Sequence, residues 1–253
     1  LPEDITVIAM PNTNIPEATF QWRDILQEFT PSENDLERQR TDELTTVYTS
    51  GSTGLPKGVM YSFEGAAHIG ENFLKSFRVT RDDRMISYLP LAHGFERAVV
   101  GFMSLHCGYT VSFNENLSTF PMDMRSVRPT IFQCVPRLWT KFQEAIVTKF
   151  GGQPHIDQLL GDDSTADATK SQIQEALGLS EGRLLLTGSA PTPIPLHDWY
   201  SALEMPLCEI YGQSEILSGT VNLPWDRKPG TLGKPTANTQ IKIAENGEIL
   251  IKA

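Results

Sequence analysis

Apolar and polar positions along the chain alternate in a way that predicts strands followed by helices. Apolar residues recur at helical spacing from Phe63 to Phe77, and Ser62 is expected to cap that helix. Another helix is expected to open at Pro136, because proline is favoured at the first helical position. Runs typical of buried strands occur at Leu44–Thr49, Met85–Leu89, Tyr109–Phe113, Thr130–Val135, Arg183–Leu186 and Leu207–Tyr211. This alternation predicts an α/β fold with largely parallel sheets flanked by helices.

The ends of the chain depart from this pattern, which suggests three parts. Residues 1–43 are polar and punctuated by proline, so we expect an irregular lead-in with a short helix between Phe20 and Phe29. Residues 44–239 form the predicted α/β core. Residues 240–253 place an Asn-Gly pair between two apolar runs, which is a β-hairpin signature. We therefore expect a truncated hairpin there, at the start of a small antiparallel β subdomain.

One internal segment has a weak pattern. Residues 151–182 contain a Gly-Gly pair, an Asp-Asp pair and little apolar content. We interpret this segment as a mobile surface excursion that ends in a short helix near Ile173–Leu177.

Composition narrows the classes of function. The chain has 253 residues, of which 40% are hydrophobic, and a formal net charge of −10. A chain with this much negative charge binds the phosphate backbone of a nucleic acid poorly, and we therefore predict no nucleic-acid partner. One local pocket can still carry positive charge and bind a nucleotide. Cys107, Cys134 and Cys208 form no CxxC pair, so the sequence shows no zinc or redox motif. Cys134 and Cys208 fall in apolar runs and are expected to be buried thiols, and three scattered cysteines favour a reducing, cytoplasmic compartment. No apolar run reaches the roughly 18 residues of a membrane-spanning helix.

The strongest single motif runs from Tyr48 to Val59 and is rich in serine, threonine and glycine. Glycine lets backbone N–H groups approach a phosphate closely, hydroxyl groups add donors, and Lys57 adds a positive charge. These features suit the β,γ-phosphates of a nucleotide. The candidate binding residues are Thr49, Ser50, Gly51, Ser52, Thr53, Gly54 and Lys57.

Two other interpretations of this motif fit less well. A Walker A loop requires a second glycine directly before its lysine and a hydroxyl residue after it. Here Pro56 precedes Lys57 and Gly58 follows it, so a P-loop NTPase is excluded. A flexible serine and glycine linker would not need a proline and a lysine at these places.

Polar loops also follow several of the predicted strands. They span residues 89–97, 135–137, 187–191 and 211–215. If the strands are parallel, these loops meet at the carboxyl edge of the sheet, where open α/β sheets bind ligands. The sequence thus predicts a ligand site at that edge.

Individual residues in these loops suggest roles. Ser214 does not form a nucleophile elbow, because Ile216 stands where that motif requires glycine. Glu215, beside a phosphate loop, is a candidate Mg²⁺ ligand. His93 follows a predicted strand end and is expected to face the pocket. The other histidines, His68, His106, His155 and His197, show no partner pattern, and we interpret them as structural or exposed.

Taken together, the motifs resemble those of the adenylate-forming superfamily, which comprises acyl-CoA synthetases, luciferases and peptide-synthetase adenylation domains. Residues 48–59 resemble its phosphate loop, and residues 187–191 resemble its adenine-contacting loop. Residues 211–215 resemble its Tyr-Gly-x-Thr-Glu motif, and residues 230–235 its glycine turn. Within the superfamily, residues 89–97 and 135–139 are most similar to AMP-forming long-chain fatty-acid–CoA ligases.

The resemblance implies a two-step reaction that uses ATP, Mg²⁺ and coenzyme A. A fatty-acid carboxylate attacks the α-phosphate of ATP, giving acyl-AMP and pyrophosphate, and the thiol of coenzyme A then takes the acyl group. It assigns the β,γ-phosphates to Ser50, Ser52, Thr53 and Lys57. The α-phosphate is assigned to Ser214, Mg²⁺ to Glu215, and the acyl carboxylate or the gate of its tunnel to His93. The adenine site would be lined by Gly188, Ser189, Ala190, Pro191 and Tyr211, with Tyr211 stacked on the ring, and Gly212 and Gln213 are further candidate nucleotide-binding residues. The acyl tunnel would run among residues 93–140.

The sequence departs from the family pattern in two ways. Ser214 stands where the family usually has threonine, which keeps the hydroxyl group. The family's ribose-binding Asp, hinge and C-terminal lid domain with its lysine would follow residue 251, and its N-terminal portion would come earlier. We therefore interpret the chain as a central fragment that does not turn over by itself. Its oligomeric state and any peripheral association with the inner face of a membrane are left open.

Two alternative functions remain open from the sequence. The chain is also compatible with the adenylation unit of a carboxylic acid reductase or another carrier-protein-loading enzyme, in which a carrier thiol replaces coenzyme A. A catalytically silent nucleotide-binding module is the other alternative. Lys57 and Glu215 argue against it, because a pure binder would not need the metal carboxylate.

Overall fold

The computed structural model describes residues 6–11, 13, 15–30, 37–49 and 55–252. The chain divides into two compact units, Leu1–Gln39 and Arg40–Ala253. In the first unit, β1 (Ile8–Ala9) pairs in parallel with β2 (Phe20–Gln21), and α1 (Trp22–Glu28) follows directly. The aromatic rings of Phe20 and Phe29 meet edge to face at either end of this helix, 5.7 Å apart. The short helix expected between these two residues is therefore present.

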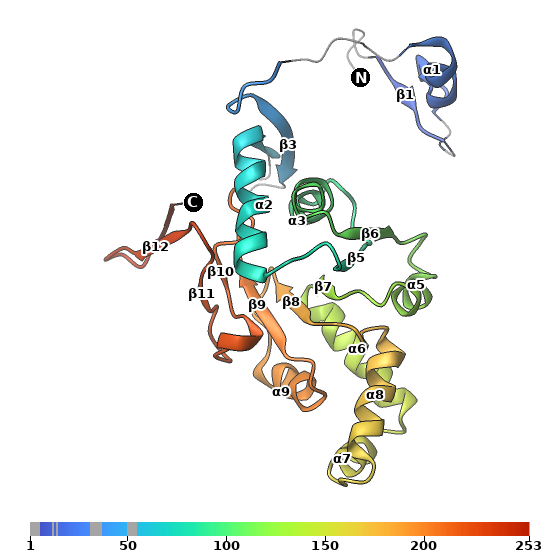
Figure 1. The fold of residues 1–253 in the computed structure, drawn as a ribbon, viewed down its shortest axis with the longest axis vertical. Coiled ribbons are helices and arrows are strands. Elements are labelled where there is room, and N and C mark those ends of the chain that lie inside the picture. Colours follow the sequence, from blue (N-terminus) through green and yellow to red (C-terminus); the bar gives the residue numbers. More distant parts are fainter. Residues whose placement is uncertain (1–5, 12, 14, 31–36, 50–54, 253) are drawn as a thin grey trace. The chain divides into compact units, whose positions relative to one another are not determined.

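The second unit is built around a mixed sheet (Figure 1). Its parallel part consists of β7 (Ile131–Cys134), β8 (Leu184–Gly188) and β9 (Leu207–Tyr211). Next to β9 run the antiparallel strands β10 (Thr220–Val221) and β11 (Lys234–Pro235). A separate parallel pair joins β5 (Arg84–Ser87) to β6 (Thr110–Phe113). The predicted α/β fold with largely parallel sheets is confirmed, and the antiparallel strands β10 and β11 are an addition to it.

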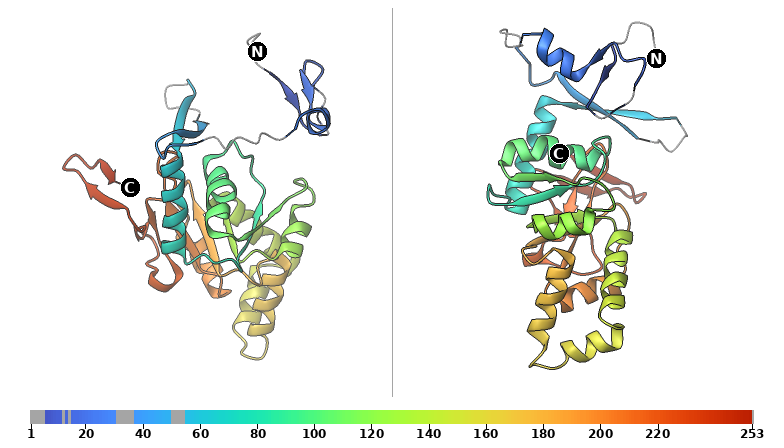
Figure 2. Two further views of the ribbon diagram at one scale, coloured as in Figure 1. Left: turned by 45° about the horizontal axis from the view of Figure 1, so that its top comes forward. Right: turned by 90° about the vertical axis from the view of Figure 1, so that its right-hand side faces the viewer.

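Helices cover both faces of β7, β8 and β9 (Figure 2). On one face, α6 (Pro136–Lys149), α7 (Gln153–Leu160), α8 (Ala166–Leu177) and α9 (Ile194–Ala202) pack around the fully buried Trp139 and Tyr200. On the other face, α2 (Phe63–Phe77) contributes Phe73 and Phe77. Burial on both sides explains why these strands are continuous apolar runs in the sequence.

Successive residues of β8 illustrate this double burial. Leu184 and Leu186 belong to the core on the α2 side, whereas Leu185 belongs to the core on the α6 side. The indole N–H of Trp139 donates to the carbonyl of Leu186 at 3.2 Å, and the hydroxyl of Tyr200 donates to the carbonyl of Trp139 at 2.7 Å. These bonds fix α6 and α9 against the sheet, because buried donors are costly when they lack acceptors.

Two hairpins flank the sheets. β3 (Glu43–Thr49) pairs antiparallel with β4 (Lys57–Ser62), and β12 (Gln240–Ile243) pairs antiparallel with β13 (Ile249–Lys252). The antiparallel hairpin predicted near the C-terminal end is confirmed. β4 was not predicted: we expected residues 57–59 to belong to the phosphate loop, but they begin a strand. Ser62 caps α2 as expected, since its hydroxyl oxygen accepts the N–H of Gly65 at 3.1 Å.

The remaining elements include a stretch of π-helix. α3 (Gly94–Glu96) continues into η1 (Arg97–Met103) and α4 (Ser104–Cys107), and the hydroxyl of Tyr109 donates to the carbonyl of Val99 in η1 at 2.5 Å. α5 (Phe120–Val127) lies between β6 and β7, and the short η2 (Pro224–Asp226) follows β10. No helix in the described part of the chain has the length and apolar character needed to cross a membrane.

The expectation of a mobile excursion at residues 151–182 was wrong. These residues form α7 and α8, whose side chains Ile156 and Ile173 have no exposed surface. Each helix has few apolar residues, so the pattern is weak, but the two helices bury those residues in the same core.

A buried carboxylate joins the amino-terminal ends of the strands. Asp83, which is 2% exposed, precedes β5 and accepts from the guanidinium Nε of Arg183 at 2.8 Å and from the hydroxyl of Thr130 at 2.7 Å. Burial raises the pKa of Asp83, but the hydrogen bonds from Arg183, Thr130 and the Thr80 backbone outweigh it and lower the pKa overall. One side chain thus ties together the segments that lead into β5, β7 and β8.

We expect Asp83→Asn to lower the free energy of unfolding by about 2 kcal/mol at pH 7, because it removes the charge that satisfies Arg183 and Thr130. A carboxyl group with a lowered folded-state pKa stabilises the fold above its unfolded pKa of about 3.9. That contribution is lost as the pH falls through the folded-state pKa. The difference between parent and variant should therefore begin to shrink below about pH 5, one unit above that reference value, and should continue to shrink as the pH falls through the lower folded-state pKa.

Urea titrations at pH 7 and pH 3 measure this difference. Asp82→Asn is the matched control, since Asp82 is an exposed neighbour with no such contacts among the described residues. Equal unfolding midpoints for the two variants at pH 7 would contradict the role of Asp83.

Candidate active site

A cavity of about 680 Å³ opens at the carboxyl ends of the parallel strands. This volume lies within the range of small-molecule sites. Its walls come from the end of β3, the segment after β5, the ends of β7 and β8, and the turn after β9. Segments that lie more than a hundred residues apart in the sequence therefore meet at one place, as the strand order predicts.

The cavity brings together part of the predicted nucleotide site. Its polar lining includes Thr49, His93, Gly188, Ser189, Gly212, Gln213 and Ser214. Lys57, Ala190, Pro191, Tyr211 and Glu215 are not in the lining. Ala190, Tyr211 and Glu215 each adjoin a lining residue in the chain, and Lys57 pairs with one across the hairpin, whereas Pro191 does neither. The predicted residues Ser50, Gly51, Ser52, Thr53 and Gly54 lie outside the described residues.

Lys57 lies next to the cavity across the β3–β4 hairpin. It is the first residue of β4 and pairs directly with Thr49, whose hydroxyl donates to the carbonyl of Lys57 at 3.4 Å. The Lys57 side chain is exposed. An exposed ammonium group on a flexible stem can reach toward a ligand from the neighbouring strand.

The turn after β9 is held by close backbone contacts. A Cβ atom on Gly212 would lie 2.1 Å from the carbonyl oxygen of Leu217, so only glycine fits at that position. The hydroxyl of Tyr61, on β4, donates to the carbonyl of Ser214. This contact joins the β3–β4 hairpin to the turn that carries Ser214 and Glu215.

The raised pKa of Tyr61 indicates where the carboxylate of Glu215 lies. Burial is the main cause that raises the pKa of Tyr61 to about 12, and the negative charge of Glu215 is the second cause. Glu215 itself is exposed. Its carboxylate therefore lies close to the hairpin, on the solvent side of the turn.

His93 lines the cavity beside Gly94, the first residue of α3. A Cβ atom on Gly94 would lie 3.8 Å from the Ser214 hydroxyl oxygen and 3.7 Å from Leu217. The segment after β5 and the turn after β9 are therefore in contact, with His93 at their junction.

Another part of the cavity lining is mostly apolar. Tyr88, Leu89, Cys134, Val135 and Leu138 line it, together with Gln133. The hydroxyl of Tyr88 donates to the carbonyl of Gln133 at 2.8 Å, which fixes the ring between β5 and β7. The part of residues 93–140 that we expected to form an acyl tunnel thus contributes to one apolar wall, with Tyr88 and Leu89 added to it.

A buried carboxyl group supports this wall from behind. Glu96 is 1% exposed and accepts the hydroxyl of Ser87 at 2.6 Å. Burial raises the pKa of Glu96 despite hydrogen bonds from Ser87, from Gln133 and from the backbone of residues 88 and 89. Sequence reasoning missed Tyr61, Tyr88 and Glu96, because their roles depend on contacts between segments that no local motif reveals.

The described residues include no group of three or more His, Cys, Asp or Glu side chains placed to hold a metal ion. A Mg²⁺ ion needs only one or two carboxylates when phosphate oxygens and water complete its octahedron. The exposed carboxylate of Glu215, beside the cavity, fits such a shared site.

Comparisons with known proteins identify the family of this chain. Residues 3–252 match the family described as AMP-binding enzyme. Long-chain-fatty-acid–CoA ligase 5 of Mus musculus is 33% identical over 250 residues, which cover 84% of this chain and 36% of that protein. Long-chain-fatty-acid–CoA ligase 6 of Homo sapiens is 32% identical over 231 residues, covering 82% and 33%. The chain therefore spans about a third of the length of these curated relatives.

Solved structures show the same fold. The N-terminal domain of FACL13 from Mycobacterium tuberculosis superposes with a TM-score of 0.66 at 23% identity, covering 92% of this chain and 55% of that domain.

Gly188, at the end of β8, generates a testable prediction. A Cβ atom there would lie 2.7 Å from the carbonyl oxygen of Ile210 and 2.8 Å from its side chain. We expect Gly188→Ala to lower the free energy of unfolding by about 2 kcal/mol, since the added methyl group must displace strand β9. Gly101→Ala is the control, because its Cβ would meet only Arg97 at an ordinary 3.6 Å. A thermal or urea midpoint for Gly188→Ala equal to that of the control would contradict the prediction.

Proposed function

The chain belongs to the family of AMP-binding enzymes, and from this premise we propose that it is the nucleotide-binding and acyl-binding core of an AMP-forming fatty-acid–CoA ligase. In the proposed reaction, an oxygen of the fatty-acid carboxylate attacks the α-phosphorus of ATP and pyrophosphate leaves. The sulfur of coenzyme A then attacks the acyl carbon, and AMP leaves. The names of the long-chain relatives support a fatty acid as the substrate.

The observation that carries the proposal is the dual character of the cavity. Its polar lining includes Thr49, Ser189 and Ser214, one from each of three predicted nucleotide-binding motifs, and another part of its lining, which includes Tyr88 and Leu138, is apolar. A fatty acid requires this combination, because its carboxylate must meet the nucleotide while its chain leaves water. A site for nucleotide alone would not need the wall that includes Tyr88 and Leu138.

We propose a separate binding role for each of the predicted side chains, based on its charge and its position. Ser214 is proposed to bind the α-phosphate, and Lys57 the β,γ-phosphates together with Ser50, Ser52 and Thr53. His93, at the junction of the polar and apolar walls, is proposed to orient the acyl carboxylate. The adenine ring is assigned to residues 188–191, with Tyr211 stacked on it. Holding the two reactants in line is the main contribution of such groups.

Glu215 is proposed to supply the carboxylate ligand of Mg²⁺, which when bound neutralises charge on the phosphate oxygens. Tyr61 fixes the turn that carries Glu215 through the Ser214 carbonyl. The hydroxyl of Tyr61 stays protonated at neutral pH, since its pKa is about 12, and so it remains a donor to that carbonyl.

We also propose a cytoplasmic location. Cys107, Cys134 and Cys208 are free and buried, which is typical of proteins in a reducing compartment. Peripheral contact with the inner face of a membrane would bring the apolar wall close to a source of fatty acid, and we keep it as part of the proposal.

Acid-dependent exchange of labelled pyrophosphate into ATP tests the function. We expect the full-length protein to catalyse exchange with long-chain fatty acids, because the apolar wall binds the alkyl chain, and to exchange poorly with acetate. Each buried methylene contributes about 0.8 kcal/mol, so the rate at low acid concentration should rise steeply with chain length. Absence of acid-dependent exchange across the whole series would refute the adenylation step.

Glu215 and Lys57 should differ in their response to magnesium. We expect Glu215→Gln in the full-length protein to lower the exchange rate by about 10²-fold and to raise the Mg²⁺ concentration needed for half-maximal rate, since the amide is a weaker ligand. Lys57→Ala should weaken binding of ATP without changing that Mg²⁺ concentration.

Glu144→Gln, on the exposed face of α6, is the control for the loss of one carboxylate. A Glu215→Gln enzyme with the rate and Mg²⁺ dependence of the parent would rule out the proposed metal ligand.

A further inference from the structure

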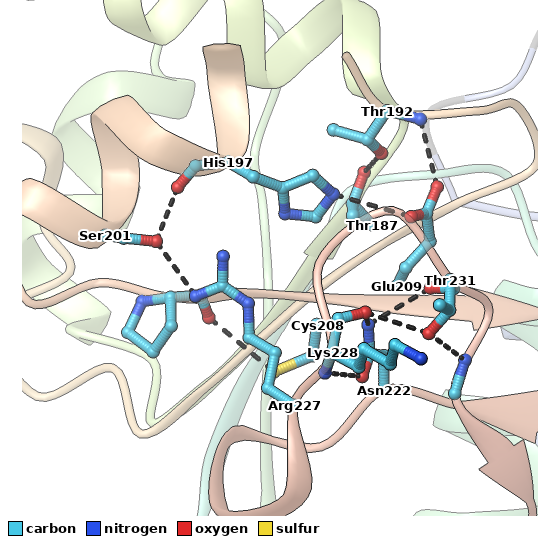
Figure 3. Close-up of polar contacts among 12 residues, drawn as sticks. Thr187, Thr192, His197, Ser201, Cys208, Glu209, Asn222, Arg227, Lys228 and Thr231 are labelled. Carbon is cyan, nitrogen blue, oxygen red and sulfur yellow. Dashed lines mark hydrogen bonds and ion pairs between the residues drawn. The ribbon is translucent and has the colours of Figure 1, made fainter. Parts of the chain in front are cut away.

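A histidine and a glutamate form a buried pair behind the loop of residues 188–191. His197, on α9, is 1% exposed, and Glu209, on β9, is 6% exposed. The Nε2 atom of His197 lies 3.4 Å from Oε2 of Glu209 (Figure 3). Neither residue lines the cavity, so neither is in place to touch a ligand there.

Glu209 connects this pair to the loop. Its other oxygen, Oε1, accepts the backbone N–H of Thr192 at 2.9 Å. The hydroxyl of Thr192 in turn lies 2.9 Å from the hydroxyl of Thr187. Thr187 and Thr192 are the residues immediately before and after the loop, so these two contacts close its base (Figure 3).

The loop needs such a closure, because its backbone is constrained. Ser189 has a φ of 66°, in the left-handed region that L-residues rarely adopt. Gly188 packs so closely on Ile210 that a Cβ atom would lie 2.7 Å from its carbonyl oxygen. A backbone conformation of this kind persists only where the surrounding structure fixes it.

His197 gives Glu209 its polar contact on the side away from the loop. Neither imidazole nitrogen has a well-formed hydrogen bond within the described part of the chain, and Glu209 is the group it faces. The backbone of His197 is itself anchored, since the hydroxyl of Ser201 donates to its carbonyl at 2.5 Å and Arg227 donates to that hydroxyl at 2.8 Å. Buried carboxylates need a partner of this type, because desolvation without compensation is costly.

We propose that His197 and Glu209 are positioning residues that hold the loop 188–191 in its binding conformation through Thr192. The inference rests on the proposed function, in which this loop contacts the adenine ring. A loop fixed before binding loses less conformational entropy when the nucleotide arrives, so the pair contributes to affinity for the adenine end of the nucleotide without touching it. The pair should have no effect on the phosphate end, which lies on other segments.

Binding measurements with two ligands in the full-length protein test the adenine end and the phosphate end of the nucleotide site separately. Isothermal titration calorimetry with AMP reports the adenine end, and titration with magnesium pyrophosphate reports the phosphate end. For His197→Phe, which keeps a ring of similar size but removes the polar contact to Glu209, we expect the Kd for AMP to rise about tenfold. The Kd for pyrophosphate should stay within about twofold of the parent.

Two further variants sharpen the result. His197→Gln retains a side-chain N–H toward Glu209, and its Kd for AMP should stay within about threefold of the parent. His155→Phe, at an exposed histidine on α7, is the matched control and should bind both ligands as the parent does. If His197→Phe fails to fold, Glu209→Met removes the acceptor of the Thr192 backbone N–H and should show the same selective loss of AMP affinity.

The outcomes distinguish the inference from the function on which it rests. A parent protein that binds neither AMP nor pyrophosphate overturns both. A parent that binds AMP, with a His197→Phe variant that binds it equally well, overturns the positioning role alone. Equal weakening of AMP and pyrophosphate in His197→Phe also overturns it, since a general loss of structure would act on both ends of the nucleotide.

Discussion

The neighbouring strands β7, β8 and β9 run in the same direction and are buried on both faces, so the chain leaves each of them at the same edge of the sheet. Their register places Cys134, Thr187 and Glu209 side by side across that edge. Parallel strands need helical crossovers, and those helices supply the two cores that bury the sheet. A shift of register by one residue would turn each of these side chains to the opposite face. The positions of the loops that follow β7, β8 and β9 at the cavity therefore depend on this pairing.

The opposite ends of the same strands are held by charge. Asp83 and Arg183 form a salt bridge in which Asp83 is nearly inaccessible to water, and Thr130 adds a hydrogen bond from the segment before β7. The cavity end has a different construction, with tight glycine contacts at residues 188 and 212 and a left-handed Ser189. A scaffold fixed at one end can support constrained loops at the other, where binding groups are concentrated.

The buried polar groups behind the cavity walls have a different role from the polar groups that line the cavity. Glu96 supports the segment of Tyr88 and Leu89, while Glu209 supports the loop after β8. Both carboxyl groups are almost fully buried. Hydrogen bonds to such buried carboxylates favour one arrangement of the segments that donate them, because another arrangement would leave the charge without those donors. The residues that line the cavity and the buried residues that position them are thus two different sets. The positions of the lining residues depend on the buried set.

The sequence by itself determined the local features: the strand at Leu207–Tyr211, the Ser62 cap, the C-terminal hairpin and the loops at the ends of parallel strands. Each depends on neighbours in the chain, such as an apolar run, a capping hydroxyl or an Asn-Gly turn, so a short window contains the information. Tertiary structure alone decided the rest. Residues 57–62 are half exposed and form a strand only because β3 lies beside them. α7 and α8 bury too few apolar side chains to be recognised singly. His197 and Glu209, which meet across α9 and β9, show no shared pattern, because a contact between two elements depends on how they pack and not on the spacing of residues along either one.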